Sequence, residues 1–347
     1  MKRYYYLLFV GLLVGGVCAT GHAQPAKYVV AFYNVENLFD TLKSPGVIDE
    51  EFTPEGPKNW DGKKYWKKLR NLEEVFYGIA STVKTYPTVI GLSEIENRNV
   101  LEDIVALERL QKANYQIAHY DSPDARGVDV ALLYRPDQFK YEGSASLKTV
   151  VPSRPDFRTR DILMVWGTIE GERFCFFVCH WPSRRGGSQS SEYLRTGAAQ
   201  SVRNAADSMM QAYPGIKIAI MGDLNDDPTD KSIYEVLEAR GDIRQVAPTG
   251  YFNPFYAMFK KGFGSLAYND AWNLFDNIIV NGTLANAAKG SLSLLKSGGN
   301  NYGTIFNRPF LLQKSGQYKN YPLRTYVGNE FQGGYSDHFP VFIFIGK

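Results

Sequence analysis

The chain has 347 residues, with 39 lysines and arginines against 36 aspartates and glutamates. Removing residues 1–23 takes away Lys2 and Arg3 and no acids, so the balance becomes 37 against 36. This near-neutral charge excludes a polybasic protein that coats nucleic acid, and any binding of polyanions must depend on a local patch.

The first residues have the pattern of a targeting segment. Lys2 and Arg3 give a positive start, residues 4–17 form an apolar run, and small residues precede Gln24. The run is shorter than the roughly 18 residues that a membrane-spanning helix needs. We therefore predict a cleaved signal peptide over residues 1–23.

Residues 24–347 are expected to form one domain of a secreted or periplasmic protein, because no later segment is long and apolar enough to span a membrane. Cys18 offers an alternative, a lipid anchor. Val17 before it is a poor match to the small residue that lipoprotein processing usually requires.

Strand and helix patterns alternate along the chain from residue 28 onward. Apolar residues at spacings of three and four predict helices at residues 65–83, 100–111, 192–212 and 229–239. Short apolar or alternating runs predict strands at residues 28–33, 88–93, 115–120, 128–134, 162–169, 173–179, 217–221, 277–280 and 339–345.

This mixture favours an α/β fold with mixed sheets flanked by helices over a purely parallel sheet. Residues 244–335 are the least regular part and are expected to form long ordered loops that carry substrate specificity. Cys175 and Cys179 lie four apart in one strand, about 13 Å by strand rise, so we predict two buried thiols and no disulfide.

Polar residues directly follow or precede the apolar strands, a placement that gathers side chains at one edge of a sheet. Carboxylates, amides and imidazoles with almost no cysteine suit a hard cation such as Mg²⁺, with Mn²⁺ as an alternative. The residues placed in this way are Asn34, Glu36, Glu94, His180, Asp223, Asn225, Asp276, Asp337 and His338.

Six segments carry a more specific resemblance. YNVEN, GLSEIEN, CHWPS, MGDLNDDP, FDNIIV and YSDHFPVF occur in this order and resemble the successive motifs of the endonuclease/exonuclease/phosphatase superfamily, which includes deoxyribonuclease I. Each motif alone is weak, but six in order are strong evidence. The resemblance implies a four-layered α/β sandwich, with two mixed sheets packed face to face and helices outside.

The resemblance also implies a role for each motif residue. Metal binding falls to Glu94 as the principal carboxylate, with Asn34, Glu36 and Asp337 around it. Catalysis falls to the GD-x-N pair Asp223 and Asn225, to His338 with its partner Asp276, and to His180.

Some roles stay open at this level. Either His180 or His338 could act as the acid or the base, and Asp223 is a competing base. Glu96 competes with Glu94 for the metal, and motif alignment favours Glu94. His119 is expected to be structural, at the rim of the site.

The substrate is expected to be a phosphodiester in DNA or RNA, which makes the protein a nuclease. Arg184 and Arg185 after His180, together with Arg160, are the candidate phosphate-binding residues. One alternative is a phosphatase or sphingomyelinase-like diesterase that acts on a small phosphoester. Another is an inactive binding protein of the same fold.

Overall fold

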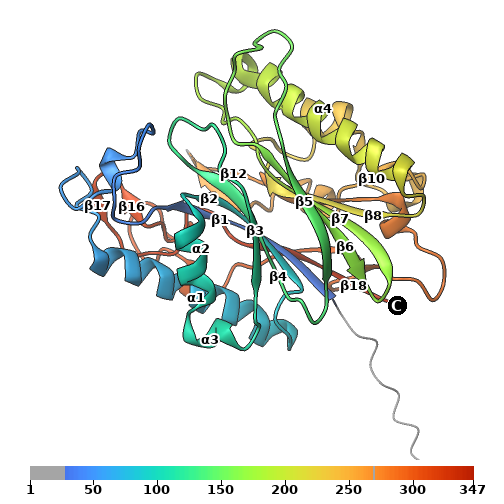
Figure 1. The fold of residues 1–347 in the computed structure, drawn as a ribbon, viewed down its shortest axis with the longest axis horizontal. Coiled ribbons are helices and arrows are strands. Elements are labelled where there is room, and N and C mark those ends of the chain that lie inside the picture. The colour runs from blue at the N-terminus through green and yellow to red at the C-terminus, as the bar shows by residue number, and fades with distance from the viewer. Residues whose placement is uncertain (1–27, 269) are drawn as a thin grey trace, which may run out of the picture.

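The computed structural model describes residues 28–268 and 270–347, which form two seven-stranded mixed sheets (Figure 1). The first sheet contains, in spatial order, β14 (Ser293–Leu295), β18 (Val341–Gly346), β1 (Tyr28–Leu38), β2 (Val89–Ile95), β4 (Asp129–Tyr134) and β3 (Gln116–His119), with β15 (Gly303–Ile305) also beside β18. The second contains β5 (Lys140–Leu147), β6 (Ile162–Ile169), β7 (Glu172–His180), β8 (Lys217–Asp223), β13 (Asp276–Asn281), β10 (Tyr251–Phe252) and β9 (Ala239–Arg240).

Successive side chains of β1 point to opposite faces of the first sheet, and each face packs into a different hydrophobic core. Val30 and Phe32 point into the core that the two sheets share, where they meet Phe176 and Met221 of the second sheet. Burying a side chain of this size stabilises the fold by about 1.5–3 kcal/mol. The sheets approach so closely that a Cβ added to Gly91 would lie 2.5 Å from the Met221 sulfur. The prediction of two packed mixed sheets is therefore confirmed.

Helices cover the outer faces of both sheets (Figure 1). α1 (Gly62–Val83) packs its apolar side on the first sheet, is capped by the Asp61 side chain, and ends at Lys84 with φ of 65°. α4 (Ser188–Ala212) packs Ala198, Val202 and its other small residues on the second sheet.

Two expectations about elements were wrong, and one strand was missed. The helix expected at 100–111 is divided into α2 (Arg98–Val105) and α3 (Glu108–Gln111), because Leu107 is extended. The helix expected at 229–239 is only a π-helical turn, Ser232–Val236, and Ala239 pairs with Tyr251 as a strand instead. The strand β5 was not predicted, because its largely polar sequence is only partly buried.

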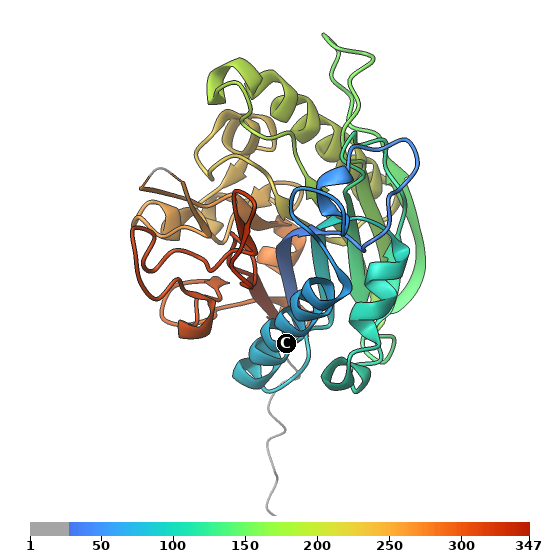
Figure 2. The same ribbon diagram turned by 90° about the vertical axis from the view of Figure 1, so that its left-hand side faces the viewer.

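Residues 244–335, which were expected to be irregular, do contain long connections, but short helices and strands interrupt them. These are the turns Ile243–Gln245 and Pro309–Leu311, the short helices α5 (Tyr256–Phe259) and α6 (Gly282–Ala285), and the hairpins β11–β12 (Leu266–Tyr268, Ala271–Asn273) and β16–β17 (Tyr326–Val327, Glu330–Phe331). A further 3-10 turn, Glu50–Phe52, lies before α1. Figure 2 shows the C-terminal connections, in orange and red, beside α1.

Cys175 and Cys179 are both buried and free, as predicted. No helix in the described part of the chain is both long and apolar enough to cross a membrane. The predicted signal peptide and Cys18 lie outside the described residues.

Candidate active site

Neighbouring strands of the second sheet bring three polar side chains side by side. Asp223, the last residue of β8, pairs with His180 of β7 on one side and with Asp276 of β13 on the other. All three residues are buried. The motif residues of the first sheet face them, since Asn34 donates a hydrogen bond from Nδ2 to Asp223 Oδ2 at 3.0 Å. The structure thus joins motifs that lie 189 residues apart.

The backbone is strained at the ends of these strands. Glu36, Glu94 and Asn225 have φ values of 52°, 63° and 49°, in the left-handed region that non-glycine residues rarely adopt. Such conformations cost about 1–3 kcal/mol each and cluster at functional sites. In β1 and β2 they coincide with irregularities in the strand pairing, between Asn34 and Leu38 and between Ser93 and Ile95.

Asp223 is the central acid of the site. Its Oδ1 accepts a hydrogen bond from the Asn225 backbone N–H at 3.0 Å. Its Oδ2 lies 3.7 Å from His180 Nε2 and 3.8 Å from His338 Nε2. Burial raises the pKa of Asp223 to about 6, and the positive charge of His338 opposes that rise.

His338 is held in a charged form by its neighbours. Its Nδ1 lies 2.7 Å from Asp276 Oδ2, and Ser265 Oγ donates to the same oxygen at 2.5 Å. Burial by itself lowers the pKa of His338, but the carboxylates of Asp276 and Asp223 outweigh it and hold the pKa well above its usual value. The Asp276–His338 pair therefore presents an imidazolium to the site at neutral pH.

His180 is held in the opposite state. Burial, followed by the positive charges of Arg160 and Arg126, lowers the pKa of His180 well below its usual value. Its Nε2 lies 3.8 Å from Glu94 Oε1. The two imidazoles thus differ in charge, which favours His338 as the proton donor or phosphate-binding cation and His180 as a neutral acceptor.

A second acidic group lies beside Asp223. Arg324 donates to Glu36 Oε1 at 3.2 Å and to Asp337 Oδ2 at 2.7 Å, and the backbone N–H of Thr325 donates to Glu36 Oε2 at 2.6 Å. Burial and the charge of Asp337 raise the pKa of Glu36 to about 7, although the nearby Lys68 and Arg324 oppose this.

Glu94 completes the site. Its Oε2 accepts a hydrogen bond from the Asn37 backbone N–H at 2.8 Å, and its side chain is 13% exposed, more open than the nearly buried Glu36. The competing Glu96 is used elsewhere, because its oxygens accept from the Asp40 N–H and the Ser44 hydroxyl. Glu94 is therefore the carboxylate available to a ligand.

The donor set fits a hard divalent cation. Carboxylate and amide oxygens dominate, and several buried acids have raised pKa values, so a cation would relieve their mutual repulsion. The residues that would hold it are Glu94, with Asn34, Glu36 and Asp337 around it.

Ligand atoms of His119, Asp121 and Asp129 also lie within 4.8 Å of one another. In that group His119 is paired with Asp129 at 3.1 Å, and Asp129 also accepts two hydrogen bonds from Ser122. These contacts hold the strand-end loop and agree with the structural role expected for His119.

Two of the three candidate phosphate-binding arginines are engaged inside the protein. Arg160 is buried and contacts Asp124 and the backbone carbonyls of His180 and Trp181. Arg184 contacts the Asn225 carbonyl and three carboxylates: Asp226, Asp227 and Asp230. Arg160 and Arg184 therefore hold the loops around the site in place, whereas Arg185 is exposed to solvent.

Replacing Arg184 and Arg185 separately should show which of them stabilises the fold of the site and which contacts the substrate. Arg184→Gln should lower the free energy of unfolding by about 1–2 kcal/mol, because it leaves Asp227 and Asp230 without the cation they share. The third contact of Arg184, Asp226, is also paired with Arg195. Arg185→Gln should leave stability unchanged. Urea unfolding and KM of both variants check this. A raised KM in Arg184→Gln with unchanged stability would contradict the supporting role.

Three polar residues of the site, Lys68, Ser265 and Arg324, were not predicted from the sequence. Lys68 of α1 is buried and donates to Thr325 Oγ1 and to the Tyr335 carbonyl at 2.5 and 2.6 Å, which fixes the loop that carries Arg324. Ser265 hydrogen-bonds Asp276. None of these residues ends an apolar strand, so strand-end placement could not reveal them.

Known proteins resemble this chain in sequence family and in fold. The sequence model described as the Endonuclease/Exonuclease/phosphatase family matches residues 29–347. No curated protein matches the sequence at a significant level.

Among solved structures, D. rerio TDP2 complexed with a single-strand DNA product is 15% identical with a TM-score of 0.53, covering 93% of this chain and 100% of that chain. The human Nocturnin catalytic domain with bound sulfate is 14% identical with a TM-score of 0.52, covering 92% and 94%. The Bacteroides thetaiotaomicron mannosyl-6-phosphatase is 15% identical with a TM-score of 0.54, covering 92% and 99%. At these identities the likeness establishes the fold.

Proposed function

We propose, because the chain belongs to the endonuclease/exonuclease/phosphatase family, that it hydrolyses phosphate esters with the help of a divalent cation such as Mg²⁺ or Mn²⁺. One observation carries the proposal: Asp223 Oδ2 lies 3.7 Å from His180 Nε2 and 3.8 Å from His338 Nε2, beside a group of carboxylates.

The side chains have complementary tasks in such a reaction. Asp223 and Asn225 orient the attacking water and the phosphate, and the His338 imidazolium neutralises charge on a phosphoryl oxygen or gives a proton to the leaving oxygen. His180 accepts a hydrogen bond as a neutral imidazole. A bound cation would supply Lewis-acid stabilisation of charge on the phosphate.

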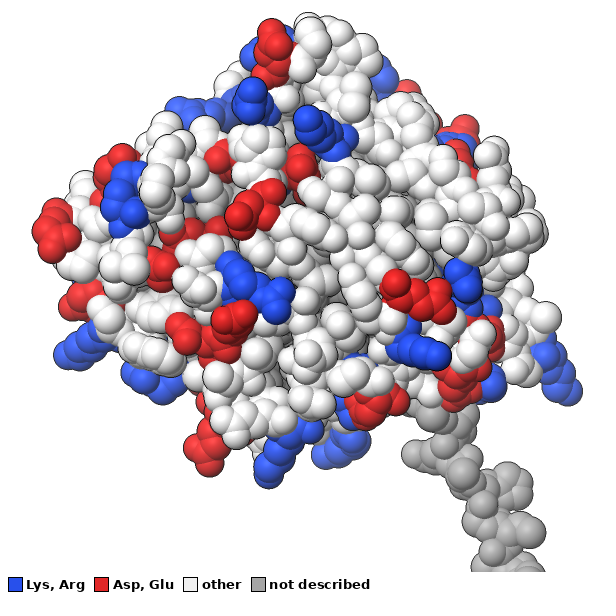
Figure 3. All heavy atoms as spheres, in the orientation of Figure 1, with Lys and Arg blue, Asp and Glu red and all other residues white. Residues whose placement is uncertain are grey.

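Two substrate classes compete. The TDP2 structure with its DNA product, a relative by fold, supports a nucleic-acid strand, the expectation from the sequence. The mannosyl-6-phosphatase, equally similar in fold, supports a small phosphoester. Arg160 and Arg184 are committed to internal contacts, and the face in Figure 3 has acidic and basic side chains interspersed rather than one basic track. These observations favour a small phosphoester as the better-supported class.

Metal removal combined with a substrate panel tests the function. We expect EDTA to lower hydrolysis by about a hundredfold or more, and Mg²⁺ or Mn²⁺ to restore it, because several kcal/mol of charge stabilisation would be lost. The panel comprises duplex DNA, RNA, inositol phosphates, sphingomyelin, sugar phosphates and nucleoside phosphates. Full activity of the chelated protein would overturn the metal dependence. Inactivity on every ester would favour a binding protein.

We also propose export to the periplasm or the medium, on the basis of the N-terminal sequence. Cleavage after Ala23 should give a mature protein that begins at Gln24 when the full chain is expressed in a bacterium. N-terminal sequencing of the exported protein checks this. A lipid-modified Cys18 at the new N-terminus would instead establish the anchor.

A further inference from the structure

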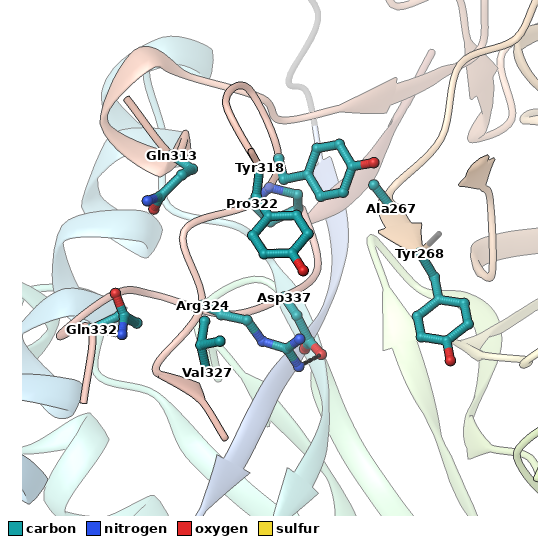
Figure 4. A pocket seen from close by; sticks show the side chains of 10 residues that line it. Ala267, Tyr268, Gln313, Tyr318, Pro322, Arg324, Val327, Gln332 and Asp337 are labelled. Carbon is teal, nitrogen blue, oxygen red and sulfur yellow. Dashed lines mark hydrogen bonds and ion pairs between the residues drawn. The ribbon is translucent and has the colours of Figure 1, made fainter. Parts of the chain in front are cut away.

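A cavity of about 170 Å³ opens directly beside the site. Arg324 and Asp337 form its border with the catalytic residues, and Tyr268 faces the loop that carries Tyr318 and Pro322 across the opening (Figure 4). We propose that this cavity binds the single uncharged ring of a small phosphate ester whose phosphate lies at the catalytic residues. The proposal rests on the proposed phosphoester hydrolysis and specifies its substrate.

The walls of the cavity are tied to the catalytic residues by backbone pairing. Leu266, at the start of the hairpin that carries Tyr268, forms an isolated bridge with His338, and Phe339 donates its N–H to the Ser265 carbonyl at 2.7 Å. A group bound against this hairpin would therefore lie at a fixed position relative to the His338 imidazole.

The opposite wall is also held in place. Tyr321 donates from its hydroxyl to Asp270 Oδ1 at 2.6 Å, and its ring lies 5.7 Å from those of both Trp272 and Tyr318. The Trp272 ring stacks on Phe339 in turn. The tyrosine wall is thus built on the residue next to His338, which favours an ordered subsite.

The lining selects for an uncharged group. Arg324 and Asp337 are its only charged residues, and Arg324 is occupied by its contacts with Asp337 at 2.7 Å and with Glu36 at 3.2 Å. The remaining polar groups are tyrosine hydroxyls and the amides of Gln313 and Gln332. Such a lining offers ring faces for stacking and neutral hydrogen-bonding groups for hydroxyl or amide edges.

The size of the cavity argues for one ring. Sites for drug-sized ligands span about 300–1,000 Å³, and this cavity is smaller, at about 170 Å³. A nucleic-acid strand would need a groove with cations that track its backbone, and the lining has no unpaired cation. A sugar and a nucleoside share the required chemistry, namely an uncharged ring with hydrogen-bonding edges joined to one phosphate.

Two exposed tyrosines allow a test that spares the fold. Tyr268 and Tyr318 are 69% and 46% exposed, so Tyr268→Ala and Tyr318→Ala, alone and together, remove ring faces without opening a core. Tyr213→Ala is the matched control, because Tyr213 is 38% exposed and lies away from the cavity beside Arg173. Each protein is assayed on a hexose phosphate, a nucleoside monophosphate, a single-stranded oligonucleotide and glycerol phosphate, which has no ring.

The measured quantity is the ratio of kcat/KM for a ring-bearing ester to that for glycerol phosphate. We expect this ratio to fall about tenfold in each single variant, as for the loss of one stacking partner, and to stay unchanged in Tyr213→Ala. The ester with the larger fall, hexose or nucleoside phosphate, identifies the ring. A wild-type protein that hydrolyses these esters while the ratio stays constant in the variants overturns the subsite. A preference of wild type for the oligonucleotide over every small ester also overturns it. Inactivity of wild type on all four esters refutes the proposed function instead.

Discussion

Asp223→Asn is expected to lower kcat by about 10²–10⁴-fold, the range for loss of a group that orients or transfers a proton. The substitution keeps the shape of the side chain and its acceptor for the Asn225 N–H, but it replaces the Oδ2 acceptor of the hydrogen bond from Asn34 Nδ2 with an NH2 group. It removes the negative charge that lies 3.7 Å from His180 and 3.8 Å from His338. KM should change much less than kcat, because the phosphate-binding residues stay in place.

The same substitution should change the stability of the metal-free protein in a way that depends on pH. The pKa of Asp223 is raised to about 6 in the folded state by burial, whereas an unfolded aspartate titrates near 3.9. Between these values the folded state binds more protons, so the contribution of Asp223 to stability falls as pH rises from about 4 to 6 and stays unfavourable above that. A neutral asparagine avoids this cost but loses the hydrogen bond from Asn34 Nδ2. The difference in melting temperature between Asp223→Asn and wild type should therefore be more favourable to the variant at pH 7 than at pH 5.

Steady-state kinetics and thermal unfolding at pH 5 and pH 7 measure both effects. Asp207→Asn serves as the control, because Asp207 accepts a hydrogen bond from Tyr251 outside the site. If Asp223→Asn retained wild-type kcat, or lost activity only together with its fold, the central role of this carboxylate would be refuted.

The sequence contains enough information to place the motif residues, and the reason is physical. A buried strand such as β8, Lys217–Asp223, is a run of apolar residues whose end is visible where a polar side chain interrupts it. Because His180, Asp223 and Asp276 each stand at such an end, one pattern locates all three.

The supporting contacts follow no such local pattern. Lys68 meets Thr325 across 257 residues, and Arg324 meets Glu36 across 288. Both depend on how the C-terminal connections pack against α1 (Figure 2), which periodicity does not describe. For Arg184 the local pattern was misleading. A basic residue shortly after His180 suggests substrate binding, but Arg184 is held by acidic residues that lie more than 40 positions away in the sequence.

The charge of each histidine was equally inaccessible to motif reasoning. His180 and His338 both follow the family pattern, but their pKa values shift in opposite directions. Burial and then the charge of Arg160 lower the pKa of His180, whereas Asp276 and Asp223 outweigh burial and raise that of His338. Only the tertiary fold brings these neighbours into place. The division of roles between the two imidazoles is therefore a property of the tertiary structure.

Arg195→Met is expected to lower the free energy of unfolding by about 3–5 kcal/mol, the cost of removing one partner from a buried ion pair. Arg195 is 1% exposed and its Nε lies 2.7 Å from Asp226 Oδ1, directly beside Asn225. Without Arg195, the Asp226 carboxylate keeps the hydrogen bond from Ser232 but loses its closest cation. Asp226→Asn should also destabilise the protein, because it removes the carboxylate paired with the buried Arg195 guanidinium, which then keeps only its hydrogen bonds to Ser188 and Ser191.

The double variant Arg195→Met/Asp226→Asn separates this pair from ordinary packing. Since neither charge then stays buried without its partner, its loss of stability should be smaller than the sum of the two single losses by at least about 1–2 kcal/mol. Urea unfolding of the four proteins measures this coupling, and additive losses would contradict it. Activity should recover together with stability in the double variant, because the pair holds α4 against the loop that presents Asn225 and contributes no group to the phosphate.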